Sequence, residues 1–143
     1  MPSIITHVAV PLALRLGLGG KVVPTRLAAC GAIGSMLPDL DVLGLRLGVP
    51  YASDFGHRGF THSLVFAAAL ALAGAGLRRW LGTTFLAAFL FLFPAIASHG
   101  RLDTLTDGGF FSARGAEVLQ SELIWVWAPA LVAGLALLAA RRR

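Results

Sequence analysis

Long apolar stretches separated by short polar segments dominate this chain. The pattern favours helices over strands and predicts five of them, over residues 3–18, 24–37, 61–77, 81–98 and 123–140. Gly17, Gly19 and Gly20 are expected to end the first helix, and Pro38 to end the second. Pro94 is expected to kink the fourth, because proline removes a helical hydrogen bond and its ring clashes with the preceding turn. The expected fold is all-α, with a single domain over residues 1–143.

Composition places these helices in a membrane. The chain is 57% hydrophobic and 13% charged, with a mean hydropathy of +0.78, whereas a soluble domain is about 45–50% apolar and about 25% charged. A small soluble domain buries only part of its surface and could not hide this much apolar area. We therefore expect an integral membrane helical bundle of about four to five helices. Only the fourth and fifth approach the roughly 20 residues that cross a bilayer unaided, so the first three are short spans or half-buried segments lining a cavity.

Small residues within the helices should allow close helix contacts of the kind that membrane packing favours; the candidates are Gly31, Gly34, Ala71, Gly74 and Ala75. Tryptophans are expected near both interfaces, Trp80 at one and Trp125 and Trp127 at the other.

Basic residues are distributed unevenly between the two membrane sides. On an alternating five-helix path, one side receives eight of the twelve: Arg15, Lys21, Arg26, Arg78, Arg79, Arg141, Arg142 and Arg143. The positive-inside rule then places this side, with the C-terminus, in the cytoplasm of a multi-pass protein of a bacterial-type inner membrane. The net charge is +5, but the basic residues are scattered among apolar runs, which favours anionic lipid over nucleic acid as a partner.

The opposite, non-cytoplasmic side receives every acidic residue and every histidine. These are Asp39, Asp41, Asp54, Asp103, Asp107, Glu117, Glu122, His7, His57, His62 and His99. Ionisable groups near a bilayer cost a few kcal/mol unless they are paired or ligated, and imidazole and carboxylate are ligands of zinc and related divalent metals. The single cysteine, Cys30, allows neither an intramolecular disulfide nor a thiolate metal site. The segregation therefore predicts a metal site at one membrane face.

Spacing narrows the candidate ligands. His99 and Asp103 are four residues apart and share one helix face. Asp39 and Asp41 follow the helix-stopping proline, and His57 and His62 flank Gly59 before the third helix. The predicted metal ligands are His7, Asp39, Asp41, His57, His62, His99 and Asp103.

Other polar residues of the same segments have expected supporting roles. One of Asp39 and Asp41 would bind metal, while the other would orient the water or act as general base; the sequence leaves this choice open. Arg58 is a candidate clamp for a phosphate oxygen and Arg101 a second, each equally suited to anchoring lipid headgroups. The residues expected to hold the ligands through hydrogen bonds are Thr61, Ser63 and Thr104.

Four motifs in fixed order carry a family resemblance: Thr6-His7, Leu-Pro-Asp-Leu-Asp over 37–41, His-Arg-Gly-Phe-Thr-His-Ser over 57–63, and His99-x-x-x-Asp103 followed by Thr-x-x-Gly. From Thr6 to Gly109 the chain resembles the YdjM-like family of inner-membrane-associated, predicted metal-dependent hydrolases, some of them described as LexA-binding.

More remotely the chain is similar to zinc-dependent phospholipase C and related zinc nucleases. This resemblance implies that a pair like His99 and Asp103 binds zinc, with the aspartate bridging two ions. The later ligands of that group are missing here, so the resemblance implies one or two ions. Gly100 and Arg101 depart from the commoner family pattern, which has apolar residues there.

These features together predict a membrane-bound hydrolase that uses a divalent metal, Zn²⁺ or Mn²⁺, to activate water. The expected substrate is a phosphoester of a lipid or amphiphile, since a site at the bilayer surface meets lipid headgroups first. One alternative is a non-enzymatic membrane protein with a structural metal site or a regulator-docking role. Another is a small metal or proton transporter, although no ionisable residue lies in the middle of the fourth or fifth predicted helix.

Overall fold

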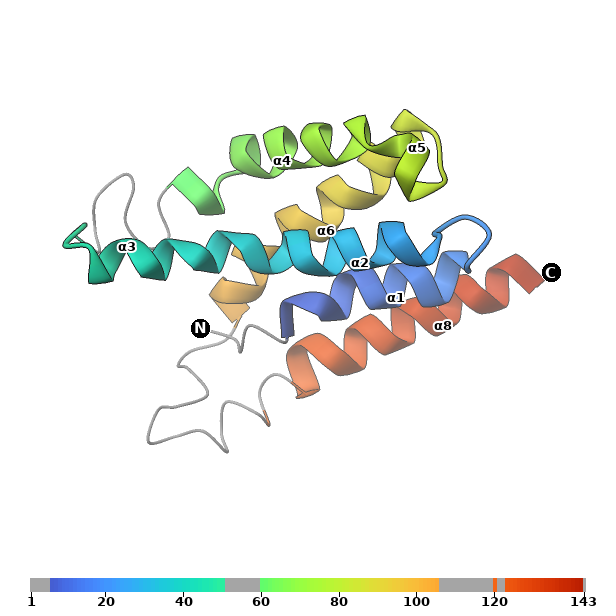
Figure 1. Ribbon diagram of the computed structural model, residues 1–143. Helices are drawn as coiled ribbons and strands as arrows, with labels where there is room; N and C mark the ends of the chain where they lie inside the picture. The colour runs from blue at the N-terminus through green and yellow to red at the C-terminus, as the bar shows by residue number, and fades with distance from the viewer. Residues whose placement is uncertain (1–5, 51–59, 106–119, 121–122, 143) are drawn as a thin grey trace.

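The computed structural model describes residues 6–50, 60–105, 120 and 123–142, and every regular element among them is helical (Figure 1). In chain order the elements are η1 (Thr6–Val8), α1 (Ala9–Leu18), α2 (Thr25–Met36), η2 (Leu37–Asp41), α3 (Val42–Arg46), η3 (Phe60–His62), α4 (Leu64–Gly76), α5 (Arg78–Leu81), α6 (Phe85–Leu105), η4 (Leu123–Trp127) and α8 (Ala128–Arg142). The elements η1, η2 and η3 are 3₁₀ turns, and η4 is a π-helical turn. The prediction of an all-α fold is confirmed for these residues.

The second helix does not stop at Pro38, as the sequence predicted. The chain continues through η2 into α3, so that α2, η2 and α3 form one nearly straight rod (Figure 1). Pro38 lies in the first turn of η2, where a helix needs no backbone N–H and proline is therefore tolerated. As a result Asp39 and Asp41 lie within a helical turn of the rod rather than in a loop after it.

Within the described part of the chain, two helices are long and apolar enough to cross a membrane, Thr25–Gly44 and Leu123–Arg142, each of 20 residues. The sequence predicted that the fourth and fifth helices approach this length. The prediction is confirmed for the fifth; for α6 the described apolar stretch is Phe85–Gly100, and the helix itself continues to Leu105. The second helix is longer than predicted, because it continues past Pro38. The other shorter apolar helices are Thr6–Leu18 and Leu64–Gly76.

Helix α6 is the centre of the bundle, with α2 and α4 each packed on it, while α1 packs on α2 and α8 packs mainly on α1 (Figure 1). The face that α4 turns toward α6 carries Ala67, Ala71 and Ala75, spaced one helical turn apart and fully or almost fully buried. A Cβ at Gly31 would lie 2.6 Å from the Phe91 ring, and one at Gly74 would lie 2.7 Å from Leu92. The predicted role of the small residues in close helix packing is therefore confirmed.

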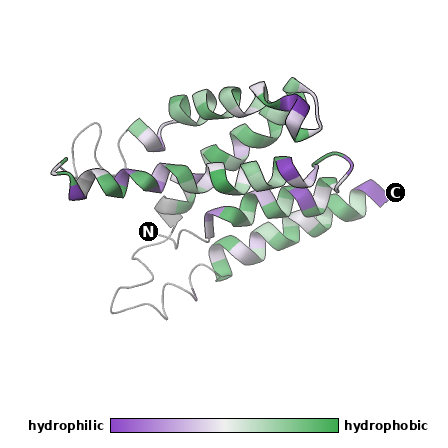
Figure 2. Cartoon of the chain, viewed as in Figure 1, coloured by the Kyte–Doolittle hydropathy of each residue, from purple (hydrophilic) through white to green (hydrophobic). Residues whose placement is uncertain are grey.

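The helices are mostly apolar along their length, with hydrophilic residues gathered near their ends (Figure 2). Val65 on α4 is 69% exposed, Leu86 on α6 64% and Val132 on α8 66%. A soluble monomer rarely leaves so much contiguous apolar surface in water, so these faces suit the hydrocarbon of a bilayer. Trp80 and Trp125 lie at opposite ends of the bundle and are both exposed, as expected of interfacial tryptophans.

Candidate metal centre

Three 3₁₀ turns and the C-terminal half of α6 meet at one end of the bundle (Figure 1). Each contributes polar side chains there: His7 from η1, Asp39 and Asp41 from η2, His62 from η3 and His99 from α6. The turns η1 and η3 lead directly into α1 and α4, whereas η2 follows α2. Up-and-down helix connectivity thus gathers residues that are far apart in sequence.

His99 is oriented by a backbone carbonyl. Its Nδ1 lies 2.8 Å from the Ser35 carbonyl oxygen, and because a carbonyl only accepts hydrogen bonds, Nδ1 is the nitrogen that carries the proton. In the neutral ring the Nε2 lone pair then faces the centre of the cluster, 3.4 Å from Asp39 Oδ1 and 3.1 Å from His62 Nε2. A histidine that donates one ring N–H to a carbonyl, and so directs its other ring nitrogen, is typical of a metal ligand.

Asp39 lies between two histidines. Its Oδ2 is 3.5 Å from His7 Nε2, while its Oδ1 faces His99. The His7 and His99 rings stack, with centroids 3.8 Å apart. Each of these three residues offers one donor atom, and the three atoms lie within 4.8 Å of one another. His7 and His99 are fully or almost fully buried, so the group is withdrawn from solvent.

The distances among these atoms fit a shared cation better than direct hydrogen bonds. The two histidine–aspartate separations, 3.4 and 3.5 Å, are longer than the roughly 2.7–2.9 Å of charge-assisted hydrogen bonds. Ligands about 2.1 Å from a tetrahedral zinc ion lie about 3.4 Å from one another. Asp39 Oδ1 is also buried and accepts no hydrogen bond from the described residues, which is costly for a carboxylate oxygen without a cation. The donor set therefore fits a divalent metal.

His62 is held by Asp41 and Thr61. The Thr61 hydroxyl donates to Asp41 Oδ2 at 2.7 Å, and its oxygen lies 3.1 Å from His62 Nδ1. Asp41 Oδ2 is itself 3.3 Å from His62 Nδ1. These acceptors favour a proton on Nδ1, so that His62 Nε2 points toward His99. His62 nevertheless lies outside the compact set formed by His7, Asp39 and His99.

The two aspartates therefore have different surroundings, a distinction that the sequence left open. Asp39 faces His7 and His99, whereas Asp41 faces Thr61 and His62. Thr61 contacts a candidate ligand, as predicted. Ser63 instead caps α4 by accepting a hydrogen bond from the Phe66 backbone N–H at 3.1 Å.

Part of the predicted site lies outside the described residues. His57 and Arg58 fall in the segment 51–59, and the side chains of Arg101, Asp103 and Thr104 are also outside the description, although their backbone continues α6 past His99. Their roles stay predictions.

The sequence did not predict the role of Ser35, which acts through a backbone carbonyl that any residue could supply. The small pair Gly34-Ser35, which lets α6 approach α2, was the only sequence signal for it.

Comparison with known proteins places this arrangement in a family. Residues 1–119 match the family described as "YdjM inner membrane protein". The chain belongs to the YdjM family. It is 42% identical to the inner membrane protein YbcI of Escherichia coli (strain K12), over an alignment that covers 92% of this chain and 94% of the relative. No solved structure matches.

Membership of the YdjM family confirms the resemblance drawn from the motifs and makes this a protein of the inner membrane. The family match spans every described segment that contributes to the candidate metal centre, from η1 to the end of α6, whereas α8 lies beyond residue 119. The remoter similarity to zinc-dependent phospholipase C stays a prediction.

Proposed function

We propose that this YdjM family protein is a membrane-bound, metal-dependent hydrolase that acts on a phosphoester of a lipid or amphiphile. The observation that carries the proposal is the orientation of His99. Its Nδ1 is committed to the Ser35 carbonyl, and its Nε2 faces a carboxylate oxygen and a second imidazole at ligand-like spacing.

His7, Asp39 and His99 are assigned as the ligands. Three protein ligands leave a coordination position for water or substrate, which is the usual arrangement of a catalytic zinc site. A bound divalent cation, Zn²⁺ or Mn²⁺, would lower the pKa of a coordinated water toward neutrality and polarise the ester. The predicted ligands His57 and Asp103 would complete a second ion site if the protein holds two.

His62 is assigned as the general base and Asp41 as its positioning residue. The Thr61 hydroxyl and the Asp41 carboxylate hold Nδ1, which leaves Nε2 at the edge of the metal centre, next to His99. A base in that place can take a proton from the attacking water. Arg58 remains the candidate clamp for the phosphoryl oxygens.

The substrate class follows from the surroundings of the site. The metal centre lies at one end of helices whose outer faces are apolar. An amphiphile can keep its chains in the bilayer while its polar group reaches that end. In a phospholipid the bonds of the polar headgroup are phosphoesters, so these are the ester bonds that such a site would meet.

A direct test measures metal content and phosphoester hydrolysis on the detergent-purified protein, stripped of metal and then restored with Zn²⁺ or Mn²⁺. We expect turnover only with metal. His62→Gln should keep the metal and lose about 10²–10⁴-fold in turnover, the usual contribution of a general base. Loss of the metal in His62→Gln would make this residue a fourth ligand instead. Absence of metal from the protein in every preparation would overturn the proposal.

The proposed topology is multi-pass, with the metal centre on the non-cytoplasmic face and the C-terminus in the cytoplasm. The basic residues at the opposite end of the bundle, such as Arg26, Arg78 and Arg141, support it. A fluorescent protein fused after Arg143 should fluoresce, whereas alkaline phosphatase fused there should be inactive. The reverse pattern would place the metal centre in the cytoplasm.

A structural metal site is the second candidate function, and the burial of the donors favours it. His7 is 0% and His99 1% exposed, and one ion there would tie η1, η2 and α6 together. A structural site is saturated with protein ligands, whereas a catalytic one keeps a position open. Tight metal binding without hydrolysis of any phosphoester would favour this candidate.

A further inference from the structure

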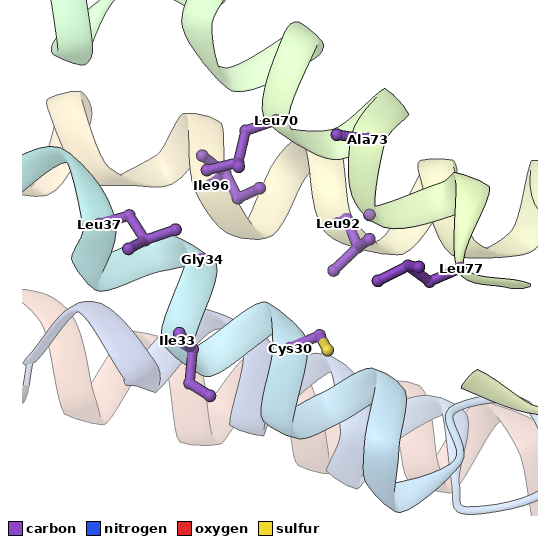
Figure 3. Close-up of a pocket in the computed structure, with 10 residues that line it drawn as sticks. Cys30, Ile33, Gly34, Leu37, Leu70, Ala73, Leu77, Leu92 and Ile96 are labelled. Carbon is purple, nitrogen blue, oxygen red and sulfur yellow. The ribbon is translucent and has the colours of Figure 1, made fainter. Parts of the chain in front are cut away.

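An apolar groove runs between α2 and α4 along the surface of α6. Both helices pack on α6 but hardly contact each other, which leaves a cavity of about 350 Å³ between them. Figure 3 shows α6 behind the groove, with Leu70, Ala73 and Leu77 on one side and Cys30, Ile33 and Leu37 on the other. Apart from Cys30, every lining residue is apolar or glycine. Ile33 and Leu77 are 61% and 56% exposed, so the groove is open to its surroundings.

The groove leads to the metal centre. Leu37 at one end is two residues from Asp39, and Ile96 on the floor is one helical turn before His99. Gly34 in the wall adjoins Ser35, whose carbonyl orients His99. Leu77 at the other end directly precedes the basic pair Arg78-Arg79. From Cys30 to Leu37 the wall is about 10 Å long at the rise of an α-helix.

We propose that this groove binds one acyl chain of a membrane phospholipid whose headgroup phosphoester lies at the metal centre. The role of the metal centre rests on the function proposed above, whereas binding of the chain requires no hydrolysis. The groove opens on an apolar face of a membrane protein, so the hydrocarbon of the bilayer is what surrounds it. Its lining offers almost nothing to a polar ligand.

A phospholipid chain is the occupant that the surroundings supply. It can enter the groove from the bilayer without leaving the hydrocarbon, and its headgroup then lies near the end of the groove where Leu37 and Ile96 adjoin the metal centre. With a helix from a second copy of the protein in the groove, the lipid cross-links described below would be absent from it.

The test uses a phospholipid with a photoreactive diazirine in one acyl chain, reconstituted with the full-length protein in lipid nanodiscs. Cross-linked peptides are mapped by mass spectrometry. We expect cross-links to concentrate on residues 30–37 and 70–77. Ala73→Trp would fill the groove and reduce these cross-links about fivefold or more. Leu131→Trp on α8, where the native side chain is 54% exposed, is the matched control and should leave them unchanged.

Cys30 gives a second measurement that needs no substitution, because it is the single cysteine of the chain and lines the groove. Adding the long-chain phospholipid to protein in a short-chain detergent should slow alkylation of Cys30 severalfold. Equal cross-linking of the groove and of the outer face of α8, or no slowing of Cys30 alkylation, would overturn the proposal.

The two proposals fail in different ways. In the metal-binding variant Asp39→Asn the groove cross-links should persist even though turnover is lost. If the protein hydrolyses phosphoesters, Ala73→Trp should lower the ratio of long-chain to short-chain kcat/KM about tenfold. Groove cross-links without turnover in the native chain would overturn only the hydrolase. Turnover with an unchanged ratio and unchanged cross-links in Ala73→Trp would overturn only the groove.

Discussion

The two ends of the helical bundle both carry polar groups, but the polar groups contact different kinds of partner. At the arginine end the side chains donate mainly to backbone carbonyls, Arg15 to Val23 at 2.9 Å and Arg141 to Leu18 at 2.8 Å, while Arg15 also donates to the Thr25 hydroxyl at 3.0 Å. Such contacts satisfy carbonyls at helix ends and in loops while the guanidinium stays near solvent. At the opposite end, called the metal end after the candidate metal centre, buried side chains contact one another: His99, which also contacts the Ser35 carbonyl, faces Asp39 and His62.

This difference determines how each end should respond to substitution. Removing Arg141 leaves the exposed Leu18 carbonyl, which water can reach, so the loss of stability is local. Removing one member of the buried cluster leaves its neighbours with an unmatched charge or lone pair, and the loss spreads through the network. Each prediction below tests that asymmetry, beginning with the largest expected effect.

His99→Ala should abolish metal binding and lower the stability of the protein by roughly 3–5 kcal/mol, the range seen when a large buried ring is truncated to alanine. The Ser35 carbonyl and Asp39 Oδ1 would both lose their facing group. Metal content by mass spectrometry and Tm in detergent measure the two effects. Arg141→Ala at the other end is the control and should lower Tm far less. Similar Tm losses in the two variants would remove the distinction between the ends.

The second prediction separates the two aspartates within the metal end. Asp39→Asn should lose most of the bound metal, because Asp39 faces both His7 and His99. Asp41→Asn should keep the metal but weaken its affinity or the turnover about 10–100-fold, since Asp41 acts through His62 and Thr61. Metal titration of both variants, with kcat and KM, is the measurement. Equal loss of metal in the two would make Asp41 a direct ligand.

The aspartates also mark the boundary of what the sequence predicts. Apolar runs locate the helices, because helices in a membrane are long and apolar. The up-and-down order of those helices brings His7, His62 and His99 to one end, as predicted. Which aspartate faces which histidine depends on the rotation of η2, and that rotation depends on Pro38 continuing the rod instead of ending it.

Backbone contacts are the other feature that the sequence conceals. The Ser35 carbonyl fixes the tautomer of His99. Every residue has a backbone carbonyl, so the sequence does not show which one makes this contact. The predicted end of the second helix at Pro38 was wrong for a related reason. Proline ends a helix only where the backbone N–H that it lacks would have made a hydrogen bond.

The third prediction concerns the packing between the two ends, where close contacts of the helix backbones hold α1 and α8 together. A Cβ at Gly134 would lie 2.9 Å from the Ala13 carbonyl oxygen, a backbone atom that is unable to move aside. Gly134→Leu should therefore lower stability by about 1–3 kcal/mol, as overpacking does. Gly76→Leu is the matched control, because a Cβ there meets nothing within 4 Å. Thermal unfolding in detergent should show a lowered Tm only for the first variant.

The smallest effect is expected at Arg26, in the first turn of α2. Its guanidinium donates to the Trp80 carbonyl at 3.0 Å and lies 5.4 Å from the centroid of the Trp80 ring. Both contacts are exposed, so Arg26→Ala should cost only about 0.5–1 kcal/mol, the range of an exposed cation–π contact. Arg26→Lys keeps the charge but loses the planar group that stacks on the ring. If Arg26→Lys is as unstable as Arg26→Ala, the contact of the planar guanidinium with Trp80 provides the stabilisation. If Arg26→Lys is as stable as the native protein, the positive charge alone provides it. A loss in Arg26→Ala as large as that in His99→Ala would mean that the arginine end is also a cooperative network, and the asymmetry between the two ends would be wrong.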